Sequence, residues 1–289
     1  MSSRAVDHLV LPVGDLGIAR ARLTALGFTV APDALHPFGT ANSCVFFVDG
    51  TYLEPLAIAN RRQMTTTAKR GNTFTARDLA FRKTRNREGL SAIVVRTEDA
   101  QAEHARFIEH GLSAGEMLEF SRPMTLADGA ESEASFRLAF AGEADAPDYF
   151  MFACQRINPL PADRGELERH ENGVVGLSEI VFSTSIASES VSVLEEVMQA
   201  KAEQQPNGLH IDAANARIRI SEASELELEF ALHGGGTGAL VARAVIFKTV
   251  DLAVTEITLA ANDVAFIRRE GRVLVSAMPG QGVLFGFEE

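Results

Sequence analysis

The sequence predicts an α+β protein of four βαβββ modules, which pair into two tandem half-open barrels with helices outside. Its 289 residues exceed the usual size of one domain and indicate two. A pattern of strand, helix and further strands occurs four times along the chain, at similar intervals. A single module of this kind exposes the apolar face of a curved sheet, and pairing with a second module covers that face.

The first module shows the pattern clearly. An apolar strand over residues 5–11 precedes Asp15, which is a plausible N-cap, and a helix that ends at Gly27. Three further strands are expected, over residues 27–30, 42–48 and 52–58. Asp49 and Gly50 separate the last two strands, and this dipeptide is a strong hairpin signal.

The other three modules are expected to follow the same order. Asp99 and Asp251 open the helices of the second and fourth modules, and the third helix is expected over residues 189–200. The strands expected in the second module cover residues 90–95, 134–140 and 149–155. Those of the third cover residues 177–182, 208–212, 216–220 and 226–230, and those of the fourth cover residues 243–247, 267–275 and 283–287.

The modules define the expected domains. Modules one and two form an N-terminal domain over residues 1–157, and modules three and four form a C-terminal domain over residues 174–289. Residues 158–173 contain two prolines and a cluster of charges, and we interpret them as the linker.

A basic insertion, residues 60–88, separates modules one and two. It carries nine arginines and lysines against two acidic residues. We expect a solvated loop with a short helix over residues 75–81. The functional alternative is a lid that places cations over the barrel mouth and attracts an anionic substrate, because long loops in compact domains are often functional.

Composition restricts the partners and the surroundings. The formal net charge is −12 and the pI is about 5.1, which argues against nucleic acids and anionic membranes as partners. No apolar run approaches the roughly 20 residues that span a bilayer, and the N-terminus lacks the features of a signal peptide. Cys44 and Cys154 form neither a metal-binding pair nor a disulfide framework. We therefore expect a cytoplasmic monomer or homodimer that binds a small molecule and needs no organic cofactor.

Three segments of the first module carry a family resemblance. They are residues 7–10 (Asp-His-Leu-Val), 36–42 (His-Pro-Phe-Gly-Thr-Ala-Asn) and 49–54 (Asp-Gly-Thr-Tyr-Leu-Glu). In this order and spacing they resemble the glyoxalase-like branch of the vicinal-oxygen-chelate superfamily, which includes glyoxalases, bleomycin-resistance proteins and dioxygenases. A second sequence motif, around Cys154-Gln155-Arg156 and His170, resembles one in related proteins. Arg156 occupies the position at which those relatives have histidine.

The resemblance implies where a metal would bind. In the superfamily's enzymes, the first and last strands of each module supply ligands to a divalent ion that acts as a Lewis acid. This implies His8 and Glu54 as metal ligands, with Glu54 also catalytic. The matching residues in modules two, three and four are Ala92 with Met151 or Phe152, Glu179 with Glu227 or Glu229, and Ala244 with Phe285.

Neither domain thus contains four ligands. His36 could join His8 and Glu54 in a two-histidine, one-carboxylate site for zinc, iron, manganese or nickel. The structural alternative is a buried, hydrogen-bonded His8–Glu54 pair, with His36 and Asn42 as turn residues and Tyr52 in the core. Otherwise His36, Asn42 and Tyr52 contact the substrate, and Tyr52 shares a strand face with Glu54. Glu227 and Glu229 would share one face of their strand, and we favour the solvent side.

Three functions remain open. The first is a metal-dependent lyase or isomerase that acts on a small oxygenated substrate. The second is a metal-free binding or resistance protein that uses the same barrel cavity, and the third is a structural or regulatory protein. A dioxygenase is disfavoured, because enzymes of that type keep their iron ligands in modules three and four, where histidines are missing from the matching strands.

Overall fold

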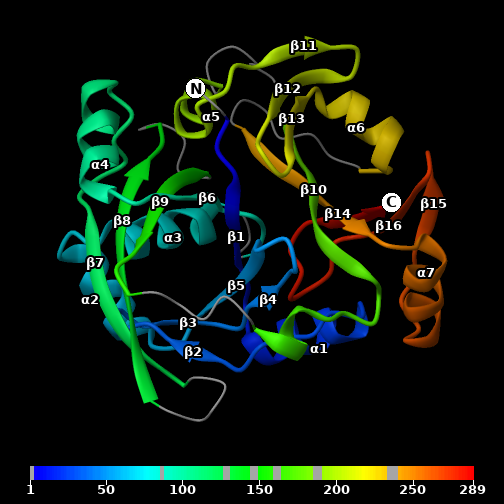
Figure 1. Cartoon of the computed structure of the whole chain (residues 1–289), viewed down its shortest axis with the longest axis horizontal. Coiled ribbons are helices and arrows are strands. Elements are labelled where there is room, and N and C mark those ends of the chain that lie inside the picture. The colour runs from blue at the N-terminus through cyan, green and yellow to red at the C-terminus, as the bar shows by residue number, and fades with distance from the viewer. Residues whose placement is uncertain are drawn as a thin grey trace.

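The computed structural model of the chain describes residues 3–84, 88–125, 131–143, 149–158, 164–184, 191–232 and 240–289. Two mixed β-sheets lie side by side with helices around them (Figure 1). No helix in these ranges is long and apolar enough to span a membrane. The order of strand, helix and three or four further strands occurs four times, which confirms the predicted α+β fold class.

The first sheet has the strand order β2-β3-β5-β1-β6-β9-β8-β7, with β4 paired to β5. Its first unit consists of β1 (Val6–Pro12), α1 (Leu16–Ala25), β2 (Ala34–Leu35), β3 (Thr40–Asn42), β4 (Val45–Phe46) and β5 (Tyr52–Ile58). Its second unit consists of β6 (Ala92–Arg96), α4 (Ala100–Glu109), β7 (Leu118–Thr125), β8 (Glu131–Ala141) and β9 (Phe150–Arg156). In the centre β1 runs antiparallel to β6, and each has the last strand of its own unit beside it in parallel.

The second sheet repeats this plan in the order β11-β12-β13-β10-β14-β17-β16-β15. Its first unit consists of β10 (Val174–Ser183), α5 (Ser192–Met198), β11 (Glu203–Gln205), β12 (Gly208–Asp212) and β13 (Arg217–Ser221), and α6 (Ala223–Phe230) follows. Its second unit consists of β14 (Val241–Thr249), α7 (Leu252–Ala261), β15 (Ile267–Arg269), β16 (Arg272–Val275) and β17 (Leu284–Glu288). The central pair is β10 and β14, again antiparallel.

The predicted helix starts are confirmed. The carboxylates of Asp15, Asp99 and Asp251 each accept a hydrogen bond from a backbone N–H group in the first turn of α1, α4 and α7. These bonds satisfy donors that have no partner within the helix.

The strand predicted over residues 27–30 does not form. Its backbone instead forms a hydrogen bond to the segment between the two sheets. The N–H group of Thr29 donates to Nδ1 of His170, 3.0 Å away. The other ring nitrogen of His170 donates to the carbonyl oxygen of Phe46 at 2.9 Å. His170 therefore joins this segment to the first unit. Of the predicted linker, residues 159–163 lie outside the described residues, and Gly165–Glu168 form a short 3-10 helix, η1.

Two predictions for the second sheet are wrong. Residues 226–230 form part of α6, because Leu226 and Phe230, one helical turn apart, are buried together and β13 already occupies the strand position beside β10. Residues 267–275 form two strands, since Glu270 and Gly271 have φ angles of 49° and 80° and turn the chain between them.

The basic insertion is helical. It contains α2 (Arg61–Lys69) and α3 (Thr73–Thr84). The short helix predicted over residues 75–81 lies within α3, but the loop expected around it is wrong; residues 85–87 lie outside the described residues. Arg82 is buried and donates hydrogen bonds to Asp78 and to the carbonyl oxygens of Val13 and Leu56. One of the basic residues therefore attaches α3 to the first sheet.

One hydrophobic core extends from the first sheet to the second. Phe28 packs against Phe247 and Phe285, with ring centroids 5.3 and 6.3 Å apart, and Phe47 lies 5.7 Å from Phe247. Smaller apolar clusters cover the concave face of each sheet. These concave faces are where the first and last strands of the units could form a site.

Candidate functional site

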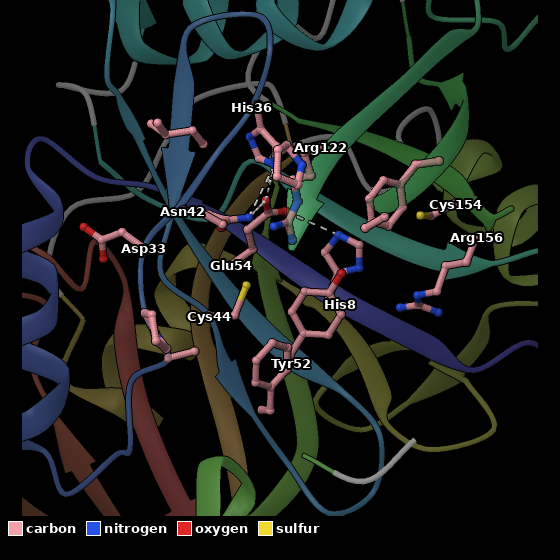
Figure 2. A pocket seen from close by; sticks show the side chains of 18 of the residues that line it. His8, Asp33, His36, Asn42, Cys44, Tyr52, Glu54, Arg122, Cys154 and Arg156 are labelled. Atoms are coloured by element: carbon pink, nitrogen blue, oxygen red, sulfur yellow. Dashed lines mark hydrogen bonds and ion pairs between the residues drawn. The ribbon is translucent and has the colours of Figure 1, made fainter. Parts of the chain in front are cut away.

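The concave face of the first sheet borders a cavity of about 1240 Å³, which is ample for a drug-sized ligand. Six phenylalanines line it: Phe38, Phe46, Phe74, Phe120, Phe136 and Phe152. The lining residues Asp33, Leu35 and Glu166 are exposed and mark the opening. Four polar residues predicted for the site are buried and come together in this cavity, namely His8, His36, Asn42 and Glu54 (Figure 2).

His8 lies on β1, and a hydrogen bond to Asp7 fixes its ring. The pairing of β1 with β6 shifts register between Val6 and His8, and Nδ1 of His8 lies 2.7 Å from a carboxylate oxygen of Asp7. The guanidinium group of Arg156, at the end of β9, donates to the same oxygen at 2.7 Å. Asp7 therefore fixes the ring of His8, and Nε2 is directed at Glu54.

Glu54 lies on β5 at the centre of the polar cluster (Figure 2). Its Oε2 is 3.5 Å from Nε2 of His8, and its Oε1 accepts a hydrogen bond of 2.7 Å from the amide of Asn42. Burial opposes ionisation of Glu54, but the interactions with His8, His36 and Asn42 together lower the pKa of the carboxyl group. Burial likewise opposes the charged form of His8, yet Asp7 and Glu54 together raise its pKa. The two residues form a buried pair that favours carboxylate and imidazolium.

His36 is placed by a tight turn. Gly39 has a φ angle of 94°, and a β-carbon there would lie 2.6 Å from the backbone nitrogen of Met64 in α2, so only glycine fits. Nδ1 of His36 hydrogen-bonds to the hydroxyl of Thr40 at 2.9 Å, and Nε2 is 3.8 Å from Oε1 of Glu54. Burial lowers the pKa of His36 to about 4, so the ring is neutral near pH 7.

Tyr52 extends the polar wall. Its ring stacks on that of His8, with centroids 4.3 Å apart and an angle of 14° between the planes. The guanidinium group of Arg164 lies 3.9 Å from the centroid of Phe46 and 5.7 Å from that of Tyr52. The structure thus brings all the predicted site residues together in one cavity.

Sequence reasoning missed three contributors: Asp7, whose role was not assigned; Arg156, which was taken only as a departure from the relatives; and Arg122. Arg122 lies on β7, a strand that was not predicted, and lines the cavity beside His36 (Figure 2). The alternation of Leu118, Phe120 and Arg122 with polar residues was the available signal.

The donors present do not fit a resident metal ion. Catalytic metal sites take about three protein ligands that converge on one point, and the described residues contain no cluster of three or more His, Cys, Asp or Glu side chains of that kind. His8 and His36 face different oxygens of Glu54. From the second unit, Ala92 and Phe152 lie on the cavity side of their strands, and Met151 belongs to the core on the other side.

The matching face of the second sheet is filled. In the register of β10 with β13, Arg219 stands opposite Val181 as Glu54 stands opposite Val10, and Glu179 takes the place of His8. The prediction of Glu227 or Glu229 at the Glu54 position is therefore wrong, because both lie on α6. In the fourth unit Ala244 faces the concave side, but Phe285 belongs to the core shared by the sheets.

Comparisons with known proteins agree with this architecture. A family model described as "Glyoxalase-like domain" matches residues 6–198, which is more than half of the chain. No curated protein matches. The fold resembles that of a hypothetical protein from Staphylococcus aureus, with a TM-score of 0.68 and 13% identity over 98% of each chain.

Two further solved structures have named activities. A mutant of 4-hydroxymandelate synthase from Streptomyces coelicolor has a TM-score of 0.62 and 12% identity, over 99% of this chain and 92% of that one. An Mn(II)-bound glyoxalase from Novosphingobium aromaticivorans has a TM-score of 0.53 and 10% identity, over 99% and 82%. At such identities the likeness shows the fold alone. With the family match, it follows that the chain belongs to the glyoxalase-like proteins of the vicinal-oxygen-chelate superfamily.

Proposed function

We propose that this chain is a lyase or isomerase that transfers a proton on a small oxygenated substrate bound in the cavity of the first sheet. The observation that carries the proposal is the buried pair of Glu54 and His8 in the wall of an otherwise largely apolar cavity. Strongly perturbed, partnered titratable groups in a cleft are typical of catalytic sites.

Glu54 is the catalytic base of the proposed reaction. Its carboxylate takes a proton from the carbon next to a carbonyl group, and the electron pair moves onto the carbonyl oxygen to give an enolate. Because the pKa of Glu54 is lowered, the carboxylate alone is a weak base. The imidazolium of His8 compensates by stabilising the negative oxygen of the enolate. On a substrate with a hydroxyl group next to the carbonyl, the enolate is an enediolate. Isomerisation then returns the proton to the former carbonyl carbon while a second proton moves between the two oxygens. On a substrate with a leaving group one carbon further along, collapse of the enolate expels that group and forms a carbon–carbon double bond, which is the lyase reaction.

The other predicted residues orient these two. Asn42 donates to one oxygen of Glu54 and leaves the other facing His8. His36 offers a neutral ring and Tyr52 an aromatic hydroxyl as substrate contacts, and both line the cavity. Asp7 and Arg156 hold His8 and are positioning residues, not catalytic ones.

The test needs no known substrate. A panel of small ketones, esters, hydroxy acids and keto acids is incubated with the protein in deuterium oxide, and proton NMR detects exchange of hydrogen for deuterium next to the carbonyl group. We expect exchange with at least one compound and a loss of about a hundredfold or more in Glu54→Gln. Glu109→Gln makes the same chemical change at an exposed site on α4 and should keep the full rate. Equal rates for wild type and Glu54→Gln would refute the proposed base.

A metal role for His8 and Glu54 remains the alternative, and it rests on the family, in which a divalent ion is common. The donors argue against it, so we expect protein purified without an affinity tag to carry well below one equivalent of zinc, iron, manganese or nickel. Mass spectrometry of wild type and His8→Ala checks this. One equivalent that disappears in the variant would replace our proposal with a metal-dependent one. Binding of panel compounds without exchange would favour a metal-free binding protein.

A further inference from the structure

Arginines without a partner carboxylate line the cavity, as far as the described residues show. Two of its lining arginines, Arg122 and Arg164, form no ion pair with a carboxylate in the parts of the chain that the structure describes. The acidic residues at the opening already have other partners, since Asp33 pairs with Arg20 and Glu166 pairs with Arg169. In a chain of net charge −12, two arginines that lack a partner carboxylate among the described residues are unexpected.

Arg122 continues an apolar wall. Along β7 the side chains of Leu118, Phe120 and Arg122 line up on the cavity side, and Phe120 stacks against Phe136 of β8 at 5.1 Å. The guanidinium group lies 6.0 Å from the centroid of Phe136. A ligand that lies along this wall would therefore contact apolar side chains over most of its length and the guanidinium group of Arg122 at one end.

Arg164 lines the same cavity. It stacks over Phe46 and lies near Tyr52, which itself stacks on His8. Cys44 and Glu54 line the same cavity as both arginines.

Such an arrangement is costly without a ligand. Two half-buried guanidinium groups beside aromatic rings have lost part of their hydration, and cation–π contacts of this kind return only part of that loss. A planar carboxylate matches the geometry of the guanidinium N–H donors and would accept the hydrogen bonds that they can form.

We infer that the ligand of this cavity is an apolar carboxylate, whose hydrocarbon body lies against Phe120 and Phe136 and whose charge is neutralised by Arg122 and Arg164. This inference rests on the proposed function, for which it names the substrate class: a small oxygenated acid. The cations come from β7 and from the segment before η1, and not from the basic insertion.

The test compares an acid with its neutral amide. Isothermal titration calorimetry measures the binding of 4-phenylbutanoate and 4-phenylbutanamide to wild type, Arg122→Gln, Arg164→Gln and the double variant. Arg61→Gln, an exposed arginine on α2, is the matched control for charge, and Arg122→Lys retains the charge without the fork. Circular dichroism checks that each variant is folded.

We expect wild type and Arg61→Gln to prefer the acid by about tenfold or more, each single variant to lose most of this preference, and Arg122→Lys to keep part of it. Equal affinity for acid and amide, or binding of neither, would overturn the inference. A preference that survives in the double variant would do so as well. The exchange panel includes uncharged ketones and esters, so proton transfer with those alone would leave the proposed function standing while this inference fails.

Discussion

The two sheets have the same plan and differ in what occupies their concave faces. On the first sheet, His8 and Glu54 border a cavity of about 1240 Å³. On the second, the matching Glu179 and Arg219 contact each other at 3.4 Å. There α6 adds Glu229, which accepts from Arg219 at 2.7 and 3.0 Å, and Phe230, which packs beneath the guanidinium group.

Arg272 completes the network on the second sheet. It lies 3.2 Å from Glu179 and 3.1 Å from Glu229, and donates to Glu288 at 2.6 Å. Every charge in this network has a partner of opposite sign within the protein. The first sheet leaves two arginines without one in the described residues. Under the proposed function, the same architecture binds a ligand where arginines lack a protein partner, and stabilises the fold where charges pair with each other.

The largest effect should follow from breaking the network of the second sheet. Arg219 is 1% exposed, and Arg219→Met would leave Glu179 and Glu229 short of a partner. Removing one member of a buried ion pair costs about 3–5 kcal/mol, and we expect a loss of this size in urea unfolding. Replacing Glu179 and Glu229 by Gln in the same chain should recover part of it. A loss below about 1 kcal/mol for Arg219→Met would show that the network is not structural.

The next effect tests positioning on the first sheet. Asp7→Asn keeps the shape of the side chain but removes the charge that holds His8. We expect proton exchange to slow by about tenfold or more, and the pKa of His8 to fall because one of the groups that raise it is gone. The pH dependence of exchange, together with NMR titration of the His8 ring, measures both. An unchanged titration of His8 would contradict the assigned role.

A smaller effect is expected from Glu54→Gln on stability. The amide can still accept from Asn42 and can donate to Nε2 of His8, so neutral hydrogen bonds replace charged ones. We expect the free energy of unfolding to change by less than about 1 kcal/mol, while activity is lost. A destabilisation as large as that of Arg219→Met would mean that this pair, too, serves mainly the fold.

The smallest effect is a difference in pH dependence. The pKa of His8 is raised above its ordinary value of 6.5, so its protonated form stabilises the folded chain. That stabilisation is fully present below pH 6.5 and is lost as the pH rises through the raised pKa. The cost of His8→Gln in urea unfolding should therefore shrink with rising pH. The cost of Arg219→Met should stay constant over that range, because arginine does not titrate there.

Much of the fold could be predicted from the sequence because it depends on local signals. The N-cap residues Asp15, Asp99 and Asp251 predict the starts of helices, and alternating apolar residues predict the central strands. The segment at Leu226 misled the prediction, because alternating Glu and Leu fits a strand, whereas spacing of four residues buries Leu226 with Phe230 in a helix. Tertiary packing decided between the two.

The site was predictable only in part. His8, Glu54, His36 and Asn42 lie in motifs that the sequence displays, and the structure brings them together. The contact of Arg156 with Asp7 spans 149 positions in the sequence, and no local pattern indicates it. Whether His8 and His36 converge on one point or face different oxygens of Glu54 is also a matter of geometry.

One hydrophobic core contains residues of both sheets. Phe28 and Phe47 of the first unit both contact Phe247, and Phe28 also contacts Phe285, so a chain cut after the family match at residue 198 would lose these contacts. The second sheet thus packs against aromatic side chains of the first unit. Damage at Arg219 should reach the distant cavity by lowering the fraction of folded molecules, and each molecule that remains folded should keep its full turnover.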